Sequence, residues 1–364
     1  MYPLNPQFNK FNNNNLDNNN IISYSLFQNN FPFNFYGQFN CSNFPYNWIT
    51  LGQNGQTEYK LSYKLMFWNI LCDHFSFDWK TSPKIELKYK VWEHRSKLFL
   101  SLLSDTKNIC DLYCFVEMDK QTEIFNMLNN VITNNAYNYI HFPRPKTPLG
   151  IMLVYNKYKF TLIEAYKYPV NLNFVFVAIL QENLGCCHNK FCVLIGHLAA
   201  WEKNEDKRIK QIELLMNSLK NDKKLKYHKI NSYILCADLN TNPDSICVKK
   251  ILGNNFISAF DLDIKNKNYT MVIDTIDEGM KMLKFDYIFS TANIEILSKN
   301  MPLYYLNFEK GMPNENYPSD HLFLTVEFSF KPKQQQKRIY FKGTDDTNYE
   351  DGKEEDKSDE KNLK

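Results

Sequence analysis

Runs of hydrophobic residues that end at a polar residue recur through the middle of the chain. Short continuous apolar runs of this kind predict buried β-strands. The runs, each given with its polar residue, are Tyr63–Leu71 with Asn69, Asp111–Glu117 with Glu117 itself, Phe191–Leu198 with His197, and Tyr233–Ala237 followed by Asp238. A polar group in such a place is costly unless it meets a partner. These strand ends are therefore candidate positions for a functional site.

A further pair of polar residues precedes the last strand that the pattern predicts. The segment Asn316–His321 ends in adjacent Asp320 and His321, and the alternating apolar run Leu322–Phe330 follows directly. Alternation with a period of two indicates a strand with one buried face. The loop entering this strand would hold a carboxylate and an imidazole at a fixed place on a sheet.

The other elements complete an alternation of strands and helices. Further strands are predicted over Ile151–Tyr155, Lys159–Ala165, Phe174–Gln181 and Phe285–Phe289, and helices over Ile85–Asp105, 120–132, Asn204–Lys220 and Ile246–Leu252. In the first of these helices the apolar stripe includes Trp92, Phe99 and Leu103, and Arg95 falls outside it. This order of elements predicts an α/β protein with two mixed β-sheets packed face to face and helices outside.

The two ends of the chain lack this periodicity. Residues 1–59 are rich in Asn, Phe and Tyr, a low-complexity composition that is typical of disorder. Residues 331–364 are rich in Lys, Asp, Glu and Gln, which indicates a solvated, disordered tail. One large domain remains over residues 60–330, and it is long enough to bury a substantial core.

Charge and hydropathy exclude some classes of function. The formal net charge of +3 over 364 residues is not that of a strong polyanion binder, although it leaves a local basic cleft open. The chain has no apolar run of the roughly 18 residues that a membrane span needs, and its N-terminus lacks a secretory signal pattern. We therefore expect a cytoplasmic or nuclear protein that does not bind membranes.

The cysteines favour the same compartments. There are nine, mostly inside strand-like runs, which is typical of reduced core thiols. Cys186, Cys187, His188 and Cys192 form a local cluster. We interpret it as a turn between two strands with incidental thiols, because no second ligand pair has the spacing of a zinc finger.

Each strand-end residue has a structural as well as a functional interpretation. Asn69 is explained equally by a hydrogen-bonded core amide and by an amide turned towards a metal or a phosphate. A buried Glu117 favours a cation, because a buried carboxylate is costly without one. A lone His197 is more often a packed core residue. Asp238 and Asn240 would share one face if the strand continued through both. Together, acids, amides and imidazoles are groups that metal-assisted phosphodiester cleavage needs.

Six short motifs occur in one order along residues 63–330. They are WNIL at 68–71, VE at 116–117, GHL at 196–198, ADLN at 237–240, FDYIF at 285–289 and PSDH at 318–321. In this set and order the chain resembles the endonuclease/exonuclease/phosphatase superfamily, which implies a four-layer α/β sandwich. The segments WEHR at 92–95, FPRP at 142–145 and NYPSDHLFL at 316–324 are similar to its nocturnin, Angel and carbon-catabolite-repression deadenylase branch.

The resemblance implies a metal site and a substrate-binding cation. Glu117 would hold Mg2+, or Mn2+ in its place, with Asn69 and Asp320 beside it, since hard oxygen ligands suit this ion. Arg144 would supply a cation to the substrate from the loop that starts at Phe142.

The resemblance also implies a set of catalytic residues. Asp238 would position or deprotonate the attacking water. Asn240 and His197 would bind the non-bridging phosphate oxygens, whose charge grows in the transition state. His321 would act as the general acid or base, or as an electrostatic partner of the phosphate, and Asp286 would orient its imidazole.

The implied activity is Mg2+-dependent phosphodiester hydrolysis. The leading hypothesis is a 3′-5′ exoribonuclease or poly(A) deadenylase that acts on RNA, with mRNA-decay proteins as partners. At the substrate rim the chain departs from the branch. Ala199, Ala200 and Trp201 follow the His-Leu motif where nocturnin-like members have basic residues, and Lys281 falls near the place of a stacking aromatic in poly(A)-specific members.

These departures support two alternative hypotheses. One is a phosphatase of a nucleotide 2′-phosphate, such as NADP, or of RNA 2′,3′-cyclic phosphate ends. The other is a catalytically weak scaffold that binds RNA or decay proteins, which is suggested by Val116 and Ala237 at positions that support the site.

Overall fold

The computed structural model describes residues 48–51, 58–77, 84–132, 135–144, 147, 149–184, 188–263, 268–275, 279–301 and 311–343. The chain divides into two units, Met1–Pro45 and Tyr46–Lys364. The first unit lies wholly outside the described residues, so the fold below is that of the second.

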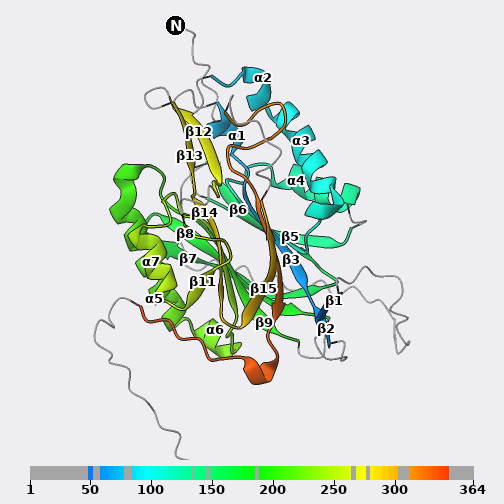
Figure 1. Cartoon of the computed structure of the whole chain (residues 1–364), viewed down its shortest axis with the longest axis vertical. Coiled ribbons are helices and arrows are strands. Elements are labelled where there is room, and N and C mark those ends of the chain that lie inside the picture. Colours follow the sequence, from blue (N-terminus) through cyan, green and yellow to red (C-terminus); the bar gives the residue numbers. More distant parts are fainter. Residues whose placement is uncertain are drawn as a thin grey trace, which may run out of the picture. The chain divides into compact units, whose positions relative to one another are not determined.

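Two six-stranded mixed sheets dominate the described residues (Figure 1). In spatial order, the first sheet contains β15 (Ile294–Asn300), β16 (Leu324–Phe330), β3 (Tyr63–Asn69), β4 (Leu112–Val116), β6 (Gly150–Asn156) and β5 (Tyr137–Pro143). The second contains β11 (Phe256–Ser258), β14 (Asp286–Thr291), β10 (Tyr233–Asp238), β9 (Lys190–His197), β8 (Asn173–Glu182) and β7 (Phe160–Val170). The pairs β3–β4 and β9–β10 are parallel, and the other neighbours are antiparallel.

Two small hairpins and several helices complete the domain. The hairpins are β1–β2 (Trp48–Leu51 and Glu58–Leu61) and β12–β13 (Met271–Thr275 and Gly279–Leu283). The α-helices are α1 (Asp73–Ser76), α2 (Leu87–Lys90), α3 (Trp92–Ser104), α4 (Gln121–Asn126), α5 (Glu205–Asn221), α6 (Lys223–Tyr227) and α7 (Ile246–Leu252). Helices α3 and α4 cover one sheet, and α5 and α7 cover the other (Figure 1).

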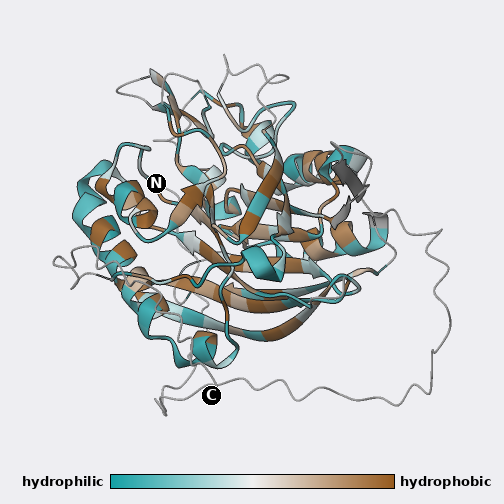
Figure 2. Ribbon diagram, turned by 60° about the horizontal axis from the view of Figure 1, so that its bottom comes forward, coloured by the Kyte–Doolittle hydropathy of each residue, from teal (hydrophilic) through white to brown (hydrophobic). Residues whose placement is uncertain are grey.

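The alternation of side chains along each strand builds the four layers. In β3, Leu65 and Phe67 point into the core between the sheets, whereas Met66 and Trp68 pack under α3. Strand β8 divides in the same way between the central core and the core beneath α5. Both faces of a central strand are covered, so apolar residues occupy most of its positions instead of every second one. The central strands are accordingly mostly brown in Figure 2. The expectation of two face-to-face sheets with helices outside is confirmed.

The first predicted helix is in fact two. Helices α2 and α3 are separated at Val91, whose extended backbone (φ −73°, ψ 140°) interrupts the run. The expectation that Arg95 lies outside the apolar stripe of this helix is wrong, because its side chain is completely buried. The 120–132 helix is α4 followed by a π-helical turn, Met127–Ile132.

The domain continues past residue 330. Phe341 is buried, with its ring centroid 5.0 Å from that of Tyr233 and 5.7 Å from that of Phe256. The backbone N–H of Lys342 donates to Asn254 Oδ1 at 2.9 Å. Residues 344–364 and 1–47 lie outside the described residues, so disorder of the two ends stays a prediction.

Candidate active site

The strand ends that the sequence singled out lie at one end of the two sheets. In the second sheet, Asp238 pairs with His197 across the parallel β9–β10 register and with Asp286 across the antiparallel β10–β14 register. In the first sheet, Asn69 at the end of β3 pairs with Val116, and Glu117 follows directly. Three neighbouring strands of one sheet and two of the other therefore deliver their polar residues to one region.

Asn69 joins the polar groups of the two sheets. Its Nδ2 donates to Glu117 Oε1 at 3.1 Å and to Asp238 Oδ2 at 3.0 Å, and it lies 3.5 Å from His321 Nε2. Its Oδ1 accepts from the backbone N–H of Leu71 at 3.1 Å. The nitrogen and the oxygen of the buried amide thus both have hydrogen-bond partners. The amide presents its hydrogens, and not its oxygen, to the carboxylates.

His321 is fixed by contacts on several sides. Its Nδ1 lies 2.8 Å from Asp286 Oδ2, and its backbone N–H donates to Ser319 Oγ at 3.1 Å. The indole of Trp68 donates to the His321 carbonyl at 2.8 Å. Ser319 Oγ also donates to the Asn69 carbonyl at 2.8 Å, which ties the His321 loop to the end of β3. The imidazole therefore has one fixed orientation, with Nε2 turned towards Asp238 at 3.9 Å.

Glu117 sits in a strained backbone conformation. Its φ is +55°, in the left-handed region that costs a residue with a Cβ about 1–2 kcal/mol. The carboxylate Oε2 accepts from the backbone N–H of Cys72 at 3.1 Å. The next residue, Met118, donates to the Gly150 carbonyl at 3.0 Å, which holds the turn against β6. Such strain persists where surrounding contacts impose it, and these positions often belong to functional sites.

Asn240 lies in a turn after β10 and not on the strand itself. Strand β10 ends at Asp238, and Asn240 has a φ of +50°. The backbone N–H of Asn240 donates to Asp238 Oδ1 at 2.9 Å, and its side-chain Nδ2 donates to the Leu198 carbonyl at 3.3 Å. The expectation that Asp238 and Asn240 share a strand face is therefore wrong.

His197 and Arg144 also lie near Glu117. His197 Nε2 is 3.6 Å from Glu117 Oε1 and 3.7 Å from Asp238 Oδ2. Arg144 Nη2 and Asn173 Nδ2 both donate to the His197 carbonyl, at 3.3 and 2.6 Å. A guanidinium thus adjoins the carboxylates without forming an ion pair with them among the described residues.

Burial and crowding of the acids shift the pKa values of the site. Burial raises the pKa of Asp238 to about 7, with the neighbouring Asp286 as the next cause, and burial with the charge of Glu117 raises the pKa of Asp320 to about 6. For His321, burial lowers the pKa, but Asp286, Asp320 and Asp238 together raise it well above its ordinary value. For His197, burial and the nearby Arg144 lower the pKa well below its ordinary value.

The acidic groups have the composition of a divalent-cation site. Glu117, His197 and Asp238 each offer a ligand atom within 4.8 Å of the others, as do Asp238, Asp286 and His321. Asp286 Oδ1 is buried and has no hydrogen-bond partner in the described part of the chain. A divalent cation would offset this concentration of buried carboxylates, and oxygen donors suit Mg2+.

The structure does not group Asp320 with the other acids of the site. Among the described residues it belongs to neither ligand group, although Glu117 is near enough to raise its pKa. Its side chain lies 3.5 Å from Ser319 Oγ. Its assignment as a metal ligand stays a prediction.

Arg95 supports the site, and no role was predicted for it. It extends from α3, donates through Nε to the Pro318 carbonyl at 2.7 Å and through Nη2 to the Ile70 carbonyl at 2.6 Å, and also bonds the Leu71 carbonyl. It therefore joins the loop after Asn69 to the loop before His321. The sequence does contain a signal for this role: the helical spacing of Trp92, Arg95 and Phe99 places Arg95 on the apolar side of the helix.

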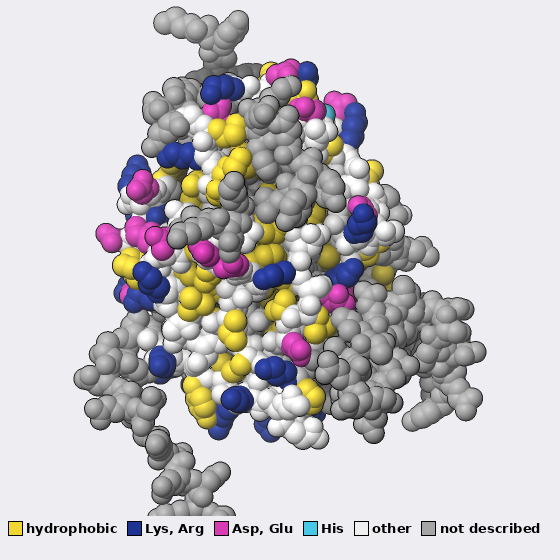
Figure 3. Space-filling model, in the orientation of Figure 1, with side chains coloured by type: hydrophobic (Ala, Val, Ile, Leu, Met, Phe, Trp, Pro, Cys, Tyr) yellow, Lys and Arg dark blue, Asp and Glu magenta, His cyan; other side chains and the backbone are white. Residues whose placement is uncertain are grey.

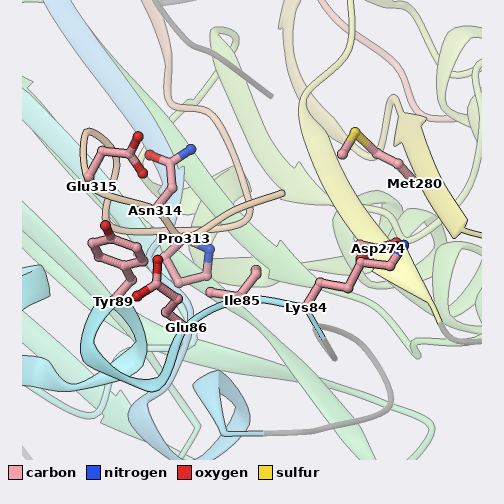
Figure 4. Close-up of a pocket in the computed structure, with 9 residues that line it drawn as sticks. All are labelled: Lys84, Ile85, Glu86, Tyr89, Asp274, Met280, Pro313, Asn314 and Glu315. Carbon is pink, nitrogen blue, oxygen red and sulfur yellow. Dashed lines mark hydrogen bonds and ion pairs between the residues drawn. The ribbon is translucent and has the colours of Figure 1, made fainter. Parts of the chain in front are cut away.

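Two other features do not contribute to this site. Cys192 is buried in β9, and His188 Nδ1 lies 3.4 Å from the Glu182 carbonyl, while Cys186 and Cys187 lie outside the described residues. A pocket of about 430 Å3 lies between the β12–β13 hairpin and the segments around α2 (Figure 4). Its described lining residues, which include Tyr89, Asp274 and Glu315, contain none of the predicted site residues.

A four-layer α/β sandwich whose strand ends gather acids, amides and imidazoles has the composition of a metal-dependent phosphohydrolase. Comparison with known proteins agrees with this class. No family model matches the chain. Nocturnin of Xenopus laevis is 22% identical over 303 residues, which cover 78% of this chain and 76% of that protein. Nocturnin of Homo sapiens is 27% identical over 293 residues, which cover 73% of this chain and 65% of that protein, just under two thirds of its length.

Solved structures show the same fold. The human nocturnin catalytic domain with bound sulfate matches with a TM-score of 0.57 and 23% identity, over 74% of this chain and 95% of that domain. ANGEL2, described as a 2′,3′-cyclic phosphatase in complex with adenosine-2′,3′-vanadate, matches with a TM-score of 0.62 and 18% identity, over 75% and 97%. The fold is that of endonuclease/exonuclease/phosphatase proteins, and the resemblance to the nocturnin and Angel branch that the motifs indicated is confirmed by matches to nocturnin and ANGEL2.

Membrane insertion finds no support in the helices. Within the described ranges, none of them combines the length and the apolar character that a membrane span requires.

Proposed function

We propose that the protein is a divalent-metal-dependent phosphodiesterase that removes nucleotides from the 3′ end of poly(A)-like RNA. One observation carries the proposal. Asp238 lies at the centre of a hydrogen-bonded cluster that contains Asn69 on one side and the Asp286–His321 pair on the other. Mg2+ or Mn2+ held by Glu117, with Asn69 and Asp320 beside it, would neutralise charge on the phosphate oxygens.

Each side chain has a role that its position supports. Asp238 holds the attacking water and can accept its proton, because burial raises the pKa of this carboxyl to about 7. Asp286 fixes the tautomer and orientation of His321 through the 2.8 Å contact at Nδ1. The protonated imidazole then faces the phosphate with Nε2, where it stabilises developing negative charge or donates a proton to the leaving oxygen.

The opposite flank binds the non-bridging oxygens of the phosphate. His197 is neutral, because burial holds its pKa well below the ordinary value, so one ring nitrogen donates and the other accepts. Asn240, which donates one side-chain hydrogen to the Leu198 carbonyl, can offer the other from the turn after β10. Arg144 adds a positive charge on the same side, behind His197.

Turnover of a 5′-labelled oligo(A) RNA by the full-length chain with Mg2+ tests this function. We expect a ladder of products shortened from the 3′ end. Asp238→Asn keeps the shape of the side chain but removes its charge, and should lower kcat/KM by at least about 10²–10³-fold, as for other groups that stabilise transition-state charge. Tyr227→Ala is the matched control, because Tyr227 is 81% exposed on α6 and takes no part in the site.

Two outcomes would contradict this proposal. Turnover that persists in EDTA, or that Asp238→Asn leaves unchanged, would exclude the proposed site.

A small phosphate ester is the second candidate substrate. The match to ANGEL2, a 2′,3′-cyclic phosphatase, favours RNA ends with a 2′,3′-cyclic phosphate. The cation Arg144 beside the site also suits an additional phosphate, as on a nucleotide 2′-phosphate. Parallel assays with oligo(A), NADP and cyclic-phosphate-ended RNA separate the candidates, because the proposal predicts the highest kcat/KM for oligo(A).

A further inference from the structure

An exposed tryptophan stands on the loop that leaves the site. Trp201 is 57% exposed and lies between β9, which ends at His197, and α5. Large aromatic side chains normally bury most of their surface. Trp201 also has a φ of +74°, a conformation that disfavours any residue with a Cβ. A strained and solvent-exposed Trp is unfavourable for the fold by itself, which points to a use outside the core.

A buried arginine fixes the backbone of this loop. Arg208 on α5 is 2% exposed. Its Nη1 donates to the carbonyls of Ala199 and Trp201 at 2.9 and 2.7 Å, and its Nη2 donates to the Glu202 carbonyl at 3.3 Å. A second α5 residue, Gln211, accepts from the Ala199 N–H at 3.0 Å. The backbone of the loop is therefore preorganised, while the Trp201 side chain stays largely exposed.

The same network connects the loop to the predicted catalytic residues. Glu205 Oε2 accepts from Arg208 Nη2 at 2.7 Å and from Thr241 Oγ1 at 3.3 Å, next to Asn240. Asn240 Nδ2 donates to the Leu198 carbonyl. Trp201 follows His197 by four positions, so the two Cα atoms are at most about 14 Å apart. That distance is within reach of the nucleotides that flank a phosphate bound at Asp238 and His321.

The chemistry of the loop suits a base better than a phosphate. Between His197 and Lys203 it contains no Lys or Arg. The adjoining β7–β8 turn, which Gln211 also bonds through the Asn171 carbonyl at 3.4 Å, presents Leu172 with 98% of its surface exposed. On the face in Figure 3, Lys and Arg side chains are interspersed with acidic and hydrophobic ones. With a net charge of only +3, affinity for a substrate needs a source besides phosphate attraction.

We propose that Trp201 is a stacking platform for a nucleobase of the substrate, next to the phosphate that is cleaved. This inference rests on the proposed function and narrows it to phosphoesters that carry a base. Every base has a π-face, so the contact favours nucleotides without selecting strictly among them. Trp201 is thus a substrate-binding residue that the predicted site did not include.

Equilibrium binding tests the platform without requiring turnover. We would measure the fluorescence anisotropy of a labelled, hydrolysis-resistant phosphorothioate oligo(A) and of an abasic strand of the same length and linkage, with the full-length chain. The wild type should bind oligo(A) more tightly than the abasic strand. Trp201→Ala should weaken oligo(A) binding roughly 10- to 100-fold, as for loss of one base–aromatic stack, and leave abasic binding unchanged. Trp201→Phe should retain most of the affinity, and Tyr227→Ala all of it.

Several results would overturn the inference. They are equal wild-type binding of the two strands, unchanged oligo(A) binding in Trp201→Ala, or an equal loss of affinity for both strands in that variant. Competition by AMP shows whether a mononucleotide suffices or a strand is needed. A failure of the proposed hydrolysis is separate, since it appears in the turnover of Asp238→Asn and not in these binding constants.

Discussion

At the scale of single residues, the two histidines of the site differ in charge although both lie near Asp238. His197 Nε2 is 3.7 Å and His321 Nε2 3.9 Å from the same Asp238 oxygen. Burial dominates at His197 and lowers its pKa, whereas three carboxylates outweigh burial at His321 and raise its pKa. An imidazolium donates from both nitrogens, and a neutral ring both donates and accepts. The two rings therefore offer a phosphate different contacts.

The raised pKa values of the acids predict how a metal ion changes stability with pH. The pKa rises from 3.8 to about 7 for Asp238 and to about 6 for Asp320, so both bind protons more tightly in the folded chain. Without metal, their contribution to the free energy of unfolding is present below about pH 4 and lost as the pH rises to about 7. Mg2+ binds the ionised carboxylates, so it should raise Tm more at pH 8 than at pH 5.5.

Thermal unfolding with and without Mg2+ at both pH values checks this expectation. Glu117→Gln should reduce the Mg2+-induced shift at pH 8. A shift that is the same at both pH values would mean that the ion does not bind these carboxyls.

Several single residues could be predicted because a buried polar side chain is conspicuous in an apolar run. Asn69, Glu117, His197 and Asp238 were found in this way, and the structure brings them together. Asn240 was found for the wrong reason. Its left-handed turn has no apolar periodicity, so strand geometry could not describe it. Trp201 was noticed only as a departure from the family motif, because exposure cannot be read from an isolated aromatic residue.

At the scale of elements, α3 does more than cover a sheet. Its buried Arg95 bonds carbonyls of two loops that are far apart in the sequence, after Asn69 and before Ser319. Desolvating a guanidinium is costly, and here the carbonyls repay that cost by hydrogen bonding. The relative position of Asn69 and His321 therefore depends on a residue that touches neither side chain.

Replacing this arginine should loosen the site and the fold together. Arg95→Met leaves the carbonyls of Ile70, Leu71 and Pro318 buried without their donor, which we expect to cost about 2–4 kcal/mol in the free energy of unfolding. Urea unfolding measures this loss, and calorimetric titration should show weaker Mg2+ binding. Lys97→Met, on the same helix with a side chain 75% exposed, is the control. Equal stability of the two variants would show that the Arg95 contacts contribute little.

Central strands could be predicted, whereas the edge strands β5, β11 and β15 and the two small hairpins could not. Strands β3, β4, β9 and β10 are buried throughout or nearly so, and their apolar runs are continuous. Edge strands such as β5 and β15 mix buried, intermediate and exposed positions, so no period stands out in the sequence. The break at Val91 was missed as well, because the helical spacing of apolar residues continues across it.

At the scale of the whole domain, the site lies where the two sheets meet at one end. Asn69 Nδ2 contacts Glu117, which follows a strand of the first sheet, and Asp238, which ends a strand of the second. Packing between the inner faces of the sheets therefore sets the distances within the site. Long sequence separations, such as the 169 residues between Asn69 and Asp238, are bridged by that packing.

The segment 331–343 should matter for stability, although its composition indicated a solvated tail. Phe341 packs into the core beneath α5, and Asn293 Nδ2 donates to the Lys337 carbonyl at 2.6 Å. Phe341→Ala should cost about 3 kcal/mol, as for other buried Phe residues. Urea unfolding tests this, with Tyr340→Ala as control because Tyr340 is 63% exposed. Equal losses in the two variants would mean that the segment does not stabilise the domain.

The central claim is that Glu117, with Asn69 and Asp320 beside it, forms a divalent-cation site next to the catalytic groups of the second sheet, and locating the ion tests it most directly. We propose anomalous diffraction from a crystal of the protein soaked in Mn2+. The expected result is a peak at a coordinating distance of about 2.1 Å from a Glu117 oxygen, beside Asn69 and Asp320. A well-occupied peak elsewhere, or none at Glu117 at saturating Mn2+, would contradict it.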